Sequence, residues 1–99
     1  MTGSPHAAFQ RACERGNVLL ALTTARELGR LSLEDALALT EVLARTGDAR
    51  FDAAAVRFLG RLADERKPTL AGIRLAAHAL GELPDESAAR VLRELLRRR

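Results

Sequence analysis

Few side chains in this sequence have the type and spacing that a catalytic or metal site needs. The chain has one cysteine, Cys13, and two histidines, His6 and His78. No cysteine, histidine or aspartate stands beside His78 at the spacing of metal ligands. The sequence also holds no glycine-rich phosphate loop, no paired-histidine motif and no recognisable Ser-His-Asp arrangement. A lone cysteine among periodic apolar residues is most often a small buried hydrophobe. We therefore expect no enzyme and no cofactor.

Arginines gather near the C-terminal end of the chain. Arg90, Arg93 and Arg97 are spaced three and four residues apart, which places them along one edge of a helix. They are candidate contacts for an anion or an acidic partner. Cations near a helix C-terminus are favourable by themselves, and this is the simpler interpretation. Across the chain, 16 Lys and Arg residues are interspersed with 13 Asp and Glu residues, which is a mixed surface rather than a dedicated basic face.

Arg57 stands between two apolar residues, Val56 and Phe58, and we expect it to be partly buried. A buried guanidinium needs a carboxylate partner, and Glu27 and Glu41 are the candidates. A structural ion pair of this kind is a simpler interpretation than an anion-binding site.

Residues 25–32 have part of the pattern of a DNA-binding helix-turn-helix. The match fails at Thr24 and Arg30, where that motif has apolar residues. The helix that follows opens with Glu34 and Asp35, whose carboxylates would face the phosphates of DNA. We therefore do not expect this element to bind DNA.

The composition favours an all-α fold, because 47% of the residues are hydrophobic and only 3% are aromatic. Alanine and leucine are strong helix formers. We expect one helical domain, residues 1–99, with residues 1–4 and 97–99 frayed. Capping residues, glycines and prolines predict about six short helices, at residues 5–15, 18–28, 32–46, from Asp48 or Asp52 to 66, from 70 to the region of Gly81 and Pro84, and from 86 toward the C-terminus.

The segment from Ser32 to Thr46 is apolar around most of its circumference. Only four of its positions make a plausible hydrated stripe: Glu34, Ala38, Glu41 and Arg45. An ordinary surface helix has a single apolar stripe. We therefore predict that this is the central helix, with neighbours packed on two of its faces.

The other helices are expected to face the core with their most regular apolar stripes. For residues 18–28 the expected stripe is Leu19, Leu22 and Ala25, and for residues 70–81 it is Leu70, Ile73, Ala76, Ala77 and Leu80. Two segments echo each other, since Ser32 and Asp48 lie 37 residues before Thr69 and Asp85. The expected architecture is a compact bundle of stacked antiparallel helix pairs, with a fragment of a HEAT-like or TPR-like solenoid as its variant.

Four runs carry a resemblance: residues 15–21 (RGNVLLA), 25–28 (AREL), 31–37 (LSLEDAL) and 53–57 (AAAVR). They are similar to small, uncharacterised, Ala- and Arg-rich helical proteins of actinobacteria, over residues 8–84. Phe58 stands where such a relative would have a tryptophan. The resemblance implies an all-helical bacterial cytoplasmic domain, and it carries no activity and no site residues to this chain.

We therefore expect a non-catalytic helical module for protein–protein interaction, with a nucleic-acid-associated accessory protein as the alternative. The sequence has no apolar run of about 18 residues and no signal-peptide pattern, so we expect a cytoplasmic protein without a membrane span. The candidate interface is a second apolar seam on the last helix, Leu92 and Leu96, with Arg93 at its rim and Leu20 as a further outward position. We expect the chain to bind a partner helix or a second copy of itself through this seam. The alternative is that Leu96 rests on the preceding helix and that the protein is a monomer.

Overall fold

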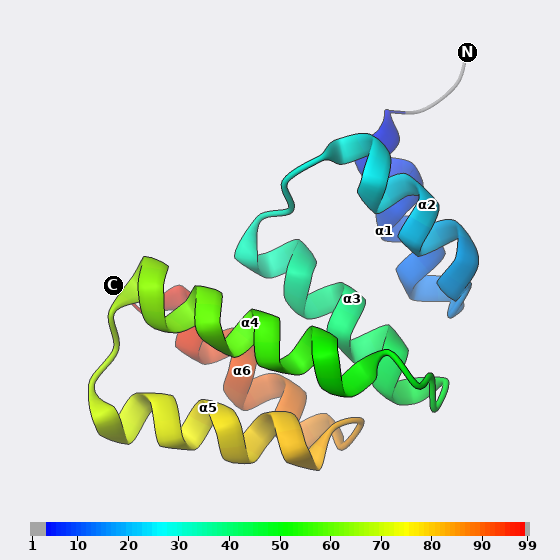
Figure 1. Cartoon of the computed structure of the whole chain (residues 1–99). Coiled ribbons are helices and arrows are strands. Elements are labelled where there is room, and N and C mark those ends of the chain that lie inside the picture. Colours follow the sequence, from blue (N-terminus) through cyan, green and yellow to red (C-terminus); the bar gives the residue numbers. More distant parts are fainter. Residues whose placement is uncertain (1–3, 99) are drawn as a thin grey trace.

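The computed structural model describes residues 4–98, and every regular element in that part of the chain is a helix. The helices are α1 (Pro5–Arg15), α2 (Val18–Leu28), α3 (Leu33–Arg45), α4 (Phe51–Arg66), α5 (Leu70–Glu82) and α6 (Glu86–Arg97) (Figure 1). They pack in sequential pairs, α1 with α2, α3 with α4 and α5 with α6. The all-α prediction is confirmed, whereas the predicted HEAT-like or TPR-like repeat stays a prediction.

Helix starts follow the capping residues of the sequence. The side chains of five N-cap residues accept a hydrogen bond from a backbone N–H in the first turn: Ser4, Asn17, Ser32, Thr69 and Asp85. Helix α4 is the exception. It begins at Phe51, after the N-cap Arg50, rather than at Asp48 or Asp52. The side chain of Asp48 instead accepts a hydrogen bond from the backbone N–H of Arg50 at 2.9 Å, which closes the turn before the helix.

The sequence predicts frayed ends at residues 1–4 and 97–99, and the structure describes residues 4, 97 and 98 of these. Residues 1–3 and 99 lie outside the described residues. Ser4 is the N-cap of α1, and Arg97 is the last residue of α6.

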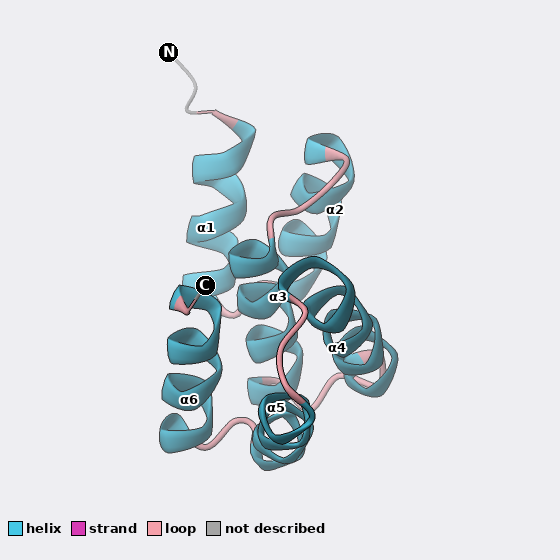
Figure 2. Cartoon of the chain, turned by 90° about the vertical axis from the view of Figure 1, so that its left-hand side faces the viewer, coloured by secondary structure: helices cyan, strands magenta, loops and turns pink. Residues whose placement is uncertain are grey.

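Helix α3 is the central helix, as predicted. It packs against α1, α2, α4 and α6 (Figure 2). Its residues Leu33 and Leu37 belong to a larger hydrophobic core formed with α4, α5 and α6. Its residue Val42 belongs to a smaller core formed with α1 and α2. One helix therefore contributes to both cores.

The inner face of α2 differs from the prediction. Leu19 is 76% exposed, whereas Ala21 and Thr24 are buried. Small side chains at these two positions allow α1 and α3 to pack closely against α2. The hydroxyl of Thr24 donates to the backbone carbonyls of Leu20 and Ala21, so burying it leaves no unpaired donor.

The inner face of α5 agrees with the prediction only in part. Ala76 and Leu80 are buried as predicted, whereas Leu70 is 70% exposed, Ala77 is exposed and Ala79 is buried instead. The reason is that α5 packs against both α4 and α6, and the face between them is centred on the small residues rather than on Leu70.

The predicted outward seam on α6 is wrong. Leu92 and Leu96 are 1% and 5% exposed and lie in the larger core. Helix α6 packs against α5 and α3 at once, so its wide apolar face is covered from two sides within the same chain. Leu20, on α2, is exposed as expected.

A helix that crosses a membrane must be both long and apolar. None of the helices described between residues 4 and 98 combines the length and the apolar character needed to cross a bilayer.

Leu43 tests the central position of α3, because its side chain is only 1% exposed. We expect Leu43→Ala to lower the free energy of unfolding by about 2–5 kcal/mol, since it removes buried methyl groups and leaves a cavity. The matched control is Leu19→Ala, the same change at an exposed position, with an expected loss below about 0.5 kcal/mol. Urea denaturation of both variants measures the difference, and equal losses would contradict the assignment.

Candidate functional site

A cleft of about 410 Å³ lies along α3, between the C-terminal halves of α1 and α6. We call it the α3 cleft. Its floor and walls are formed by apolar and charged residues together: Cys13, Glu14, Glu34, Leu37, Ala38, Glu41, Arg45, Arg93, Leu96 and Arg97. All four residues of the predicted hydrated stripe of α3 line it. The stripe is therefore located correctly, but it is a cleft between helices rather than an open surface.

Glu41 was predicted to be hydrated, but its side chain is only 11% exposed. Its Oε1 accepts a hydrogen bond from Nη2 of Arg93 at 2.7 Å, which joins α3 to α6 across the cleft wall. Arg93 also lies 3.6 Å from a carboxylate oxygen of Glu86. A carboxylate this buried requires its cation, so Arg93 has a structural task within the chain.

The opposite wall of the cleft is fixed by Arg45. Its Nη2 donates to the backbone carbonyl of Cys13 at 2.6 Å, near the C-terminus of α1. At the other end of α1, Nε2 of His6 lies 2.8 Å from Oδ2 of Asp35, near the N-terminus of α3. These two contacts show that α1 runs in the same direction as α3.

The remaining end of the cleft lies where α4 and α6 meet α3. Arg66 of α4 donates to the backbone carbonyl of Leu96, and its Nη2 lies 3.4 Å from Oε2 of Glu34. Leu96 is therefore near the N-terminus of α3, whereas Arg93 is nearer its C-terminus, so α6 runs antiparallel to α3. Arg97 has an 80% exposed side chain and lies 3.8 Å from Glu94.

Cys13 is a buried free thiol on the α1 side of the cleft, which agrees with the interpretation as a small core residue. Burial raises the pKa of this thiol from 9.0 to about 11. Arg45 acts in the opposite direction, and the carboxylates of Asp35, Glu41 and Glu14 add smaller upward contributions. The thiol is therefore protonated at neutral pH and is a poor nucleophile.

The candidate residues of the sequence analysis are brought together only in part. Arg93 and Arg97 line the α3 cleft, whereas Arg90 lies outside it. All three arginines line a second depression along α6. Leu20 is on α2 and contributes nothing to the cleft. The expected ion pair of Arg57 is wrong: this side chain is exposed, and among the described residues it has no ion-pair partner.

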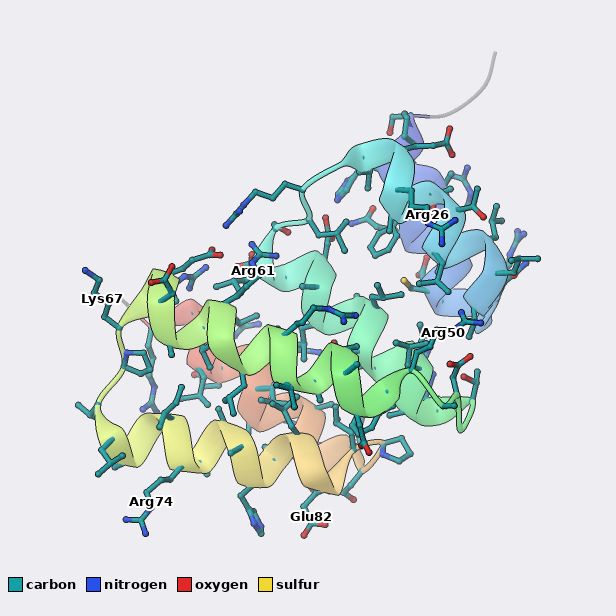
Figure 3. All side chains as sticks on the ribbon, in the orientation of Figure 1. Arg26, Arg50, Arg61, Lys67, Arg74 and Glu82 are labelled. Atoms are coloured by element: carbon teal, nitrogen blue, oxygen red, sulfur yellow. The ribbon has the colours of Figure 1, made fainter. Side chains whose placement is uncertain are left out.

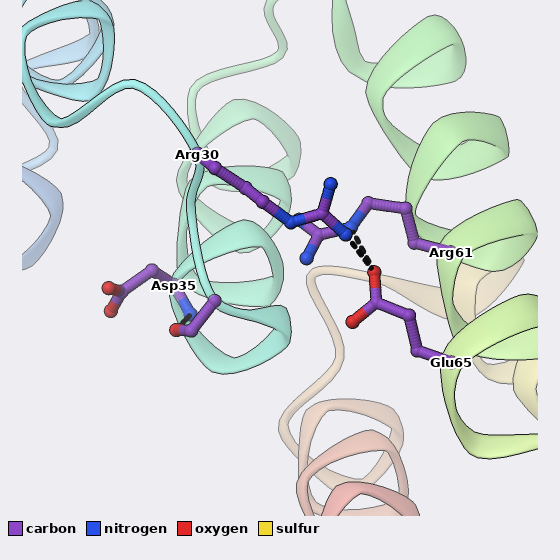
Figure 4. Close-up of polar contacts among 5 residues, drawn as sticks. Arg30, Asp35, Arg61 and Glu65 are labelled. Carbon is purple, nitrogen blue, oxygen red and sulfur yellow. Dashed lines mark hydrogen bonds and ion pairs between the residues drawn. The ribbon is translucent and has the colours of Figure 1, made fainter.

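One polar contact across the fold was not expected. Nη2 of Arg30 and Nε of Arg61 both donate to Oε2 of Glu65, at 2.8 and 2.7 Å (Figure 4). The hydrogen bond from Arg61 is the main reason that the pKa of the Glu65 carboxyl is lowered. The contact joins the α2–α3 connection to α4. The four-residue spacing of Arg61 and Glu65 was visible in the sequence, but the contribution of Arg30 was not.

Within residues 4–98, no three histidine, cysteine, aspartate or glutamate side chains are grouped so that they could hold a metal ion. The α3 cleft combines an apolar floor with three carboxylates and three guanidinium groups. Such a lining is suited to binding an amphipathic group rather than to a particular reaction.

Comparison with known proteins gave no match to a family model, to a curated protein or to a solved structure. The resemblance to Ala- and Arg-rich actinobacterial proteins therefore stays a prediction.

The raised pKa of Cys13 predicts slow reaction with a thiol reagent in the native protein. At pH 8 a thiol with a pKa near 11 has about a hundredfold less thiolate than an ordinary cysteine, and burial slows the reaction further. We expect Ellman's reagent to label Cys13 at least about a hundredfold faster in guanidinium than in buffer.

The raised pKa of Cys13 also predicts how the free energy of unfolding changes with pH. The raised pKa favours the folded state while the thiol is protonated, so this contribution is complete below pH 9 and is lost as the pH rises toward about 11. The difference in unfolding free energy between the wild type and Cys13→Ala should therefore shrink over that range. Fast labelling of the native protein at pH 8, or a pH-independent difference, would contradict the burial of this thiol.

Proposed function

We propose that this protein is a non-catalytic helical module that binds a segment of another protein in the α3 cleft. The observation that carries the proposal is the cleft itself, a concave site between three helices with an apolar floor and a charged rim. Interfaces of this kind depend on a few anchoring side chains placed in pockets, with polar contacts around them.

The dimensions of the cleft favour a side chain as its occupant. Its volume of about 410 Å³ is in the lower part of the range of ligand pockets, about 300–1,000 Å³. One or two side chains of a partner fill such a space, whereas a whole helix does not. The floor around Leu37, Ala38 and Leu96 is apolar, so the anchor is an apolar side chain.

The charged residues at the rim of the cleft determine which residues of the partner can lie beside this apolar side chain. Glu14 and Glu34 supply negative charge, and Arg45 and Arg97 supply positive charge. A rim of both signs is complementary to a segment that has charged residues of both signs around its apolar anchor.

Two of the three predicted arginine contacts on α6 are paired with carboxylates of the same chain, which favours a protein partner over a nucleic acid. Arg93 is held by Glu41 and Glu86, and Arg97 lies beside Glu94. Phosphate binding depends on cations whose charge is free to be neutralised by the nucleic acid. We further propose that the protein acts in the cytoplasm, where the reducing environment keeps Cys13 as a thiol.

A cleft-filling substitution tests the proposal. Ala38 is half-buried on the cleft floor, and Ala38→Phe fills the space that the anchor would occupy. The matched control is Ala53→Phe at an exposed position of α4. Peptides selected from a displayed library on the wild type are expected to bind Ala38→Phe at least about tenfold more weakly, because the anchor is excluded. They should bind Ala53→Phe like the wild type.

Two results would contradict the proposal. One is a set of selected peptides whose affinity is unchanged by Ala38→Phe, with circular dichroism showing that the variant is folded. The other is binding of a DNA or RNA duplex whose affinity falls steeply with salt, because that dependence reports the release of counterions from phosphates.

A further inference from the structure

A pocket of about 520 Å³ lies where α4 and α6 end and α3 begins. We call it the arginine pocket, because three of its six lining residues are arginines: Arg66, Arg97 and Arg98, together with Glu34, Glu65 and Leu96. Glu34, Leu96 and Arg97 also line the α3 cleft. The two hollows therefore adjoin, and a segment bound in the α3 cleft can continue into the arginine pocket.

Two further arginines stand at the edge of this pocket. Arg30 and Arg61 both donate to Oε2 of Glu65, which is one of the lining residues (Figure 4). Arg61 points from α4 toward the α2–α3 connection, which brings the two guanidinium groups together (Figure 3). One carboxylate is thus shared by two cations, and its charge balances only one of them.

The arginines that line the pocket are also incompletely paired. A carboxylate oxygen of Glu34 lies 3.4 Å from Arg66, and one of Glu94 lies 3.8 Å from Arg97. The side chain of Arg97 is 80% exposed, so most of its N–H donors face solvent. Among the described residues, Arg98 makes no ion pair. Five guanidinium groups therefore stand with three carboxylates, which is a surplus of two positive charges.

Helix dipoles account for only some of these cations. Arginines are favourable near the C-termini of α4 and α6, which accounts for Arg66, Arg97 and Arg98. Arg30 differs, because it stands just before the N-terminus of α3, where the dipole disfavours a cation. Glu65 already has Arg61 at the favourable spacing of four residues, so the fold does not need a second cation there.

The surroundings of the surplus charge favour the acidic side chains of a protein segment. The pocket shares the apolar residue Leu96 with the α3 cleft, and Glu34 and Glu65 lie among its arginines. A nucleic acid carries one charge at every phosphate, and these two carboxylates would repel it. Two carboxylates of a peptide balance a surplus of two and leave the existing pairs in place.

We propose that the segment bound in the α3 cleft carries two acidic residues on one side of its apolar anchor, and that they lie in the arginine pocket against Arg97 and Arg98. The inference rests on the proposed function of the cleft. Glu34 lies one turn before Ala38, about 6 Å along α3. An extended chain advances about 3.3 Å per residue, so the acidic residues begin about two positions from the anchor.

Reversing the charges on both partners tests the proposal. The probe is a peptide selected from the displayed library on the wild type, and its affinity is measured by titration calorimetry. Replacing its two acidic residues by the matching amides should weaken binding at least about tenfold. Arg97→Glu combined with Arg98→Glu should weaken binding of the unchanged peptide as much. A peptide with lysines in place of the two acids should bind this double variant to within about threefold of the original affinity.

The matched control is Arg90→Glu, the same charge change on the same helix. Arg90 lines neither the α3 cleft nor the arginine pocket, so the affinity should stay within about twofold. Arg97→Gln combined with Arg98→Gln removes the charges without reversing them and should weaken binding by less. Circular dichroism checks that every variant keeps its helices. Binding of the original peptide should also weaken as NaCl is raised, whereas binding of its amide version should change little.

Four results would overturn the inference, and they separate it from the proposed function. Selected peptides without acidic residues that still lose affinity with Ala38→Phe would leave the proposed function intact. Acidic peptides that respond to the charge reversal but not to Ala38→Phe would overturn the proposed function as well, because the arginine pocket would then bind without the cleft. A selection without any binding peptide would overturn both. Displacement of the peptide by an equal concentration of a single-stranded oligonucleotide would assign the pocket to phosphates instead.

Discussion

The rest of the structure depends on the burial of α3 from two sides. Leu37 packs into the larger core and Val42 into the smaller one, on the same three-turn helix. The pair α1 and α2 is joined to α4, α5 and α6 chiefly through this helix. Apolar burial is the main favourable contribution to folding, and here one helix is necessary for it in both cores. A loss of packing at α3 therefore affects the whole chain rather than one half of it.

A helix buried on two sides has only a narrow face left for polar residues, and in this protein that face is the α3 cleft. Glu41 is held there by Arg93, and Arg45 holds the C-terminus of α1 through the carbonyl of Cys13. The same contacts that fix α1 and α6 to the central helix thus give the candidate site its walls. Helix α5 lies outside this arrangement, which leaves its outer face open.

The helices and the central position of α3 could be predicted from the sequence, because both depend on local signals. Capping side chains such as Ser32 satisfy amides within the next turn, and the periodicity of α3 is wide enough to require two neighbours. The inward faces of α2 and α6 were not predictable in the same way. On α2 the exposed Leu19 is more hydrophobic than the buried Thr24, since close approach of helices selects small side chains. The partner of Glu41 was also beyond reach, because Arg93 is 52 residues away and many other arginines were equally plausible.

Helix α3 belongs to both cores, and native-state hydrogen exchange of the backbone amides measures the consequence for its stability. The backbone amides of α3 around Val42 should be the most protected of the chain and should exchange only through global unfolding, because opening this helix breaks both cores. Amides of α2 and α5, each at the edge of the fold, should exchange faster through local openings. Exchange of the α3 amides as fast as those of α5 would show the opposite, that the two cores open independently of the helix that they share.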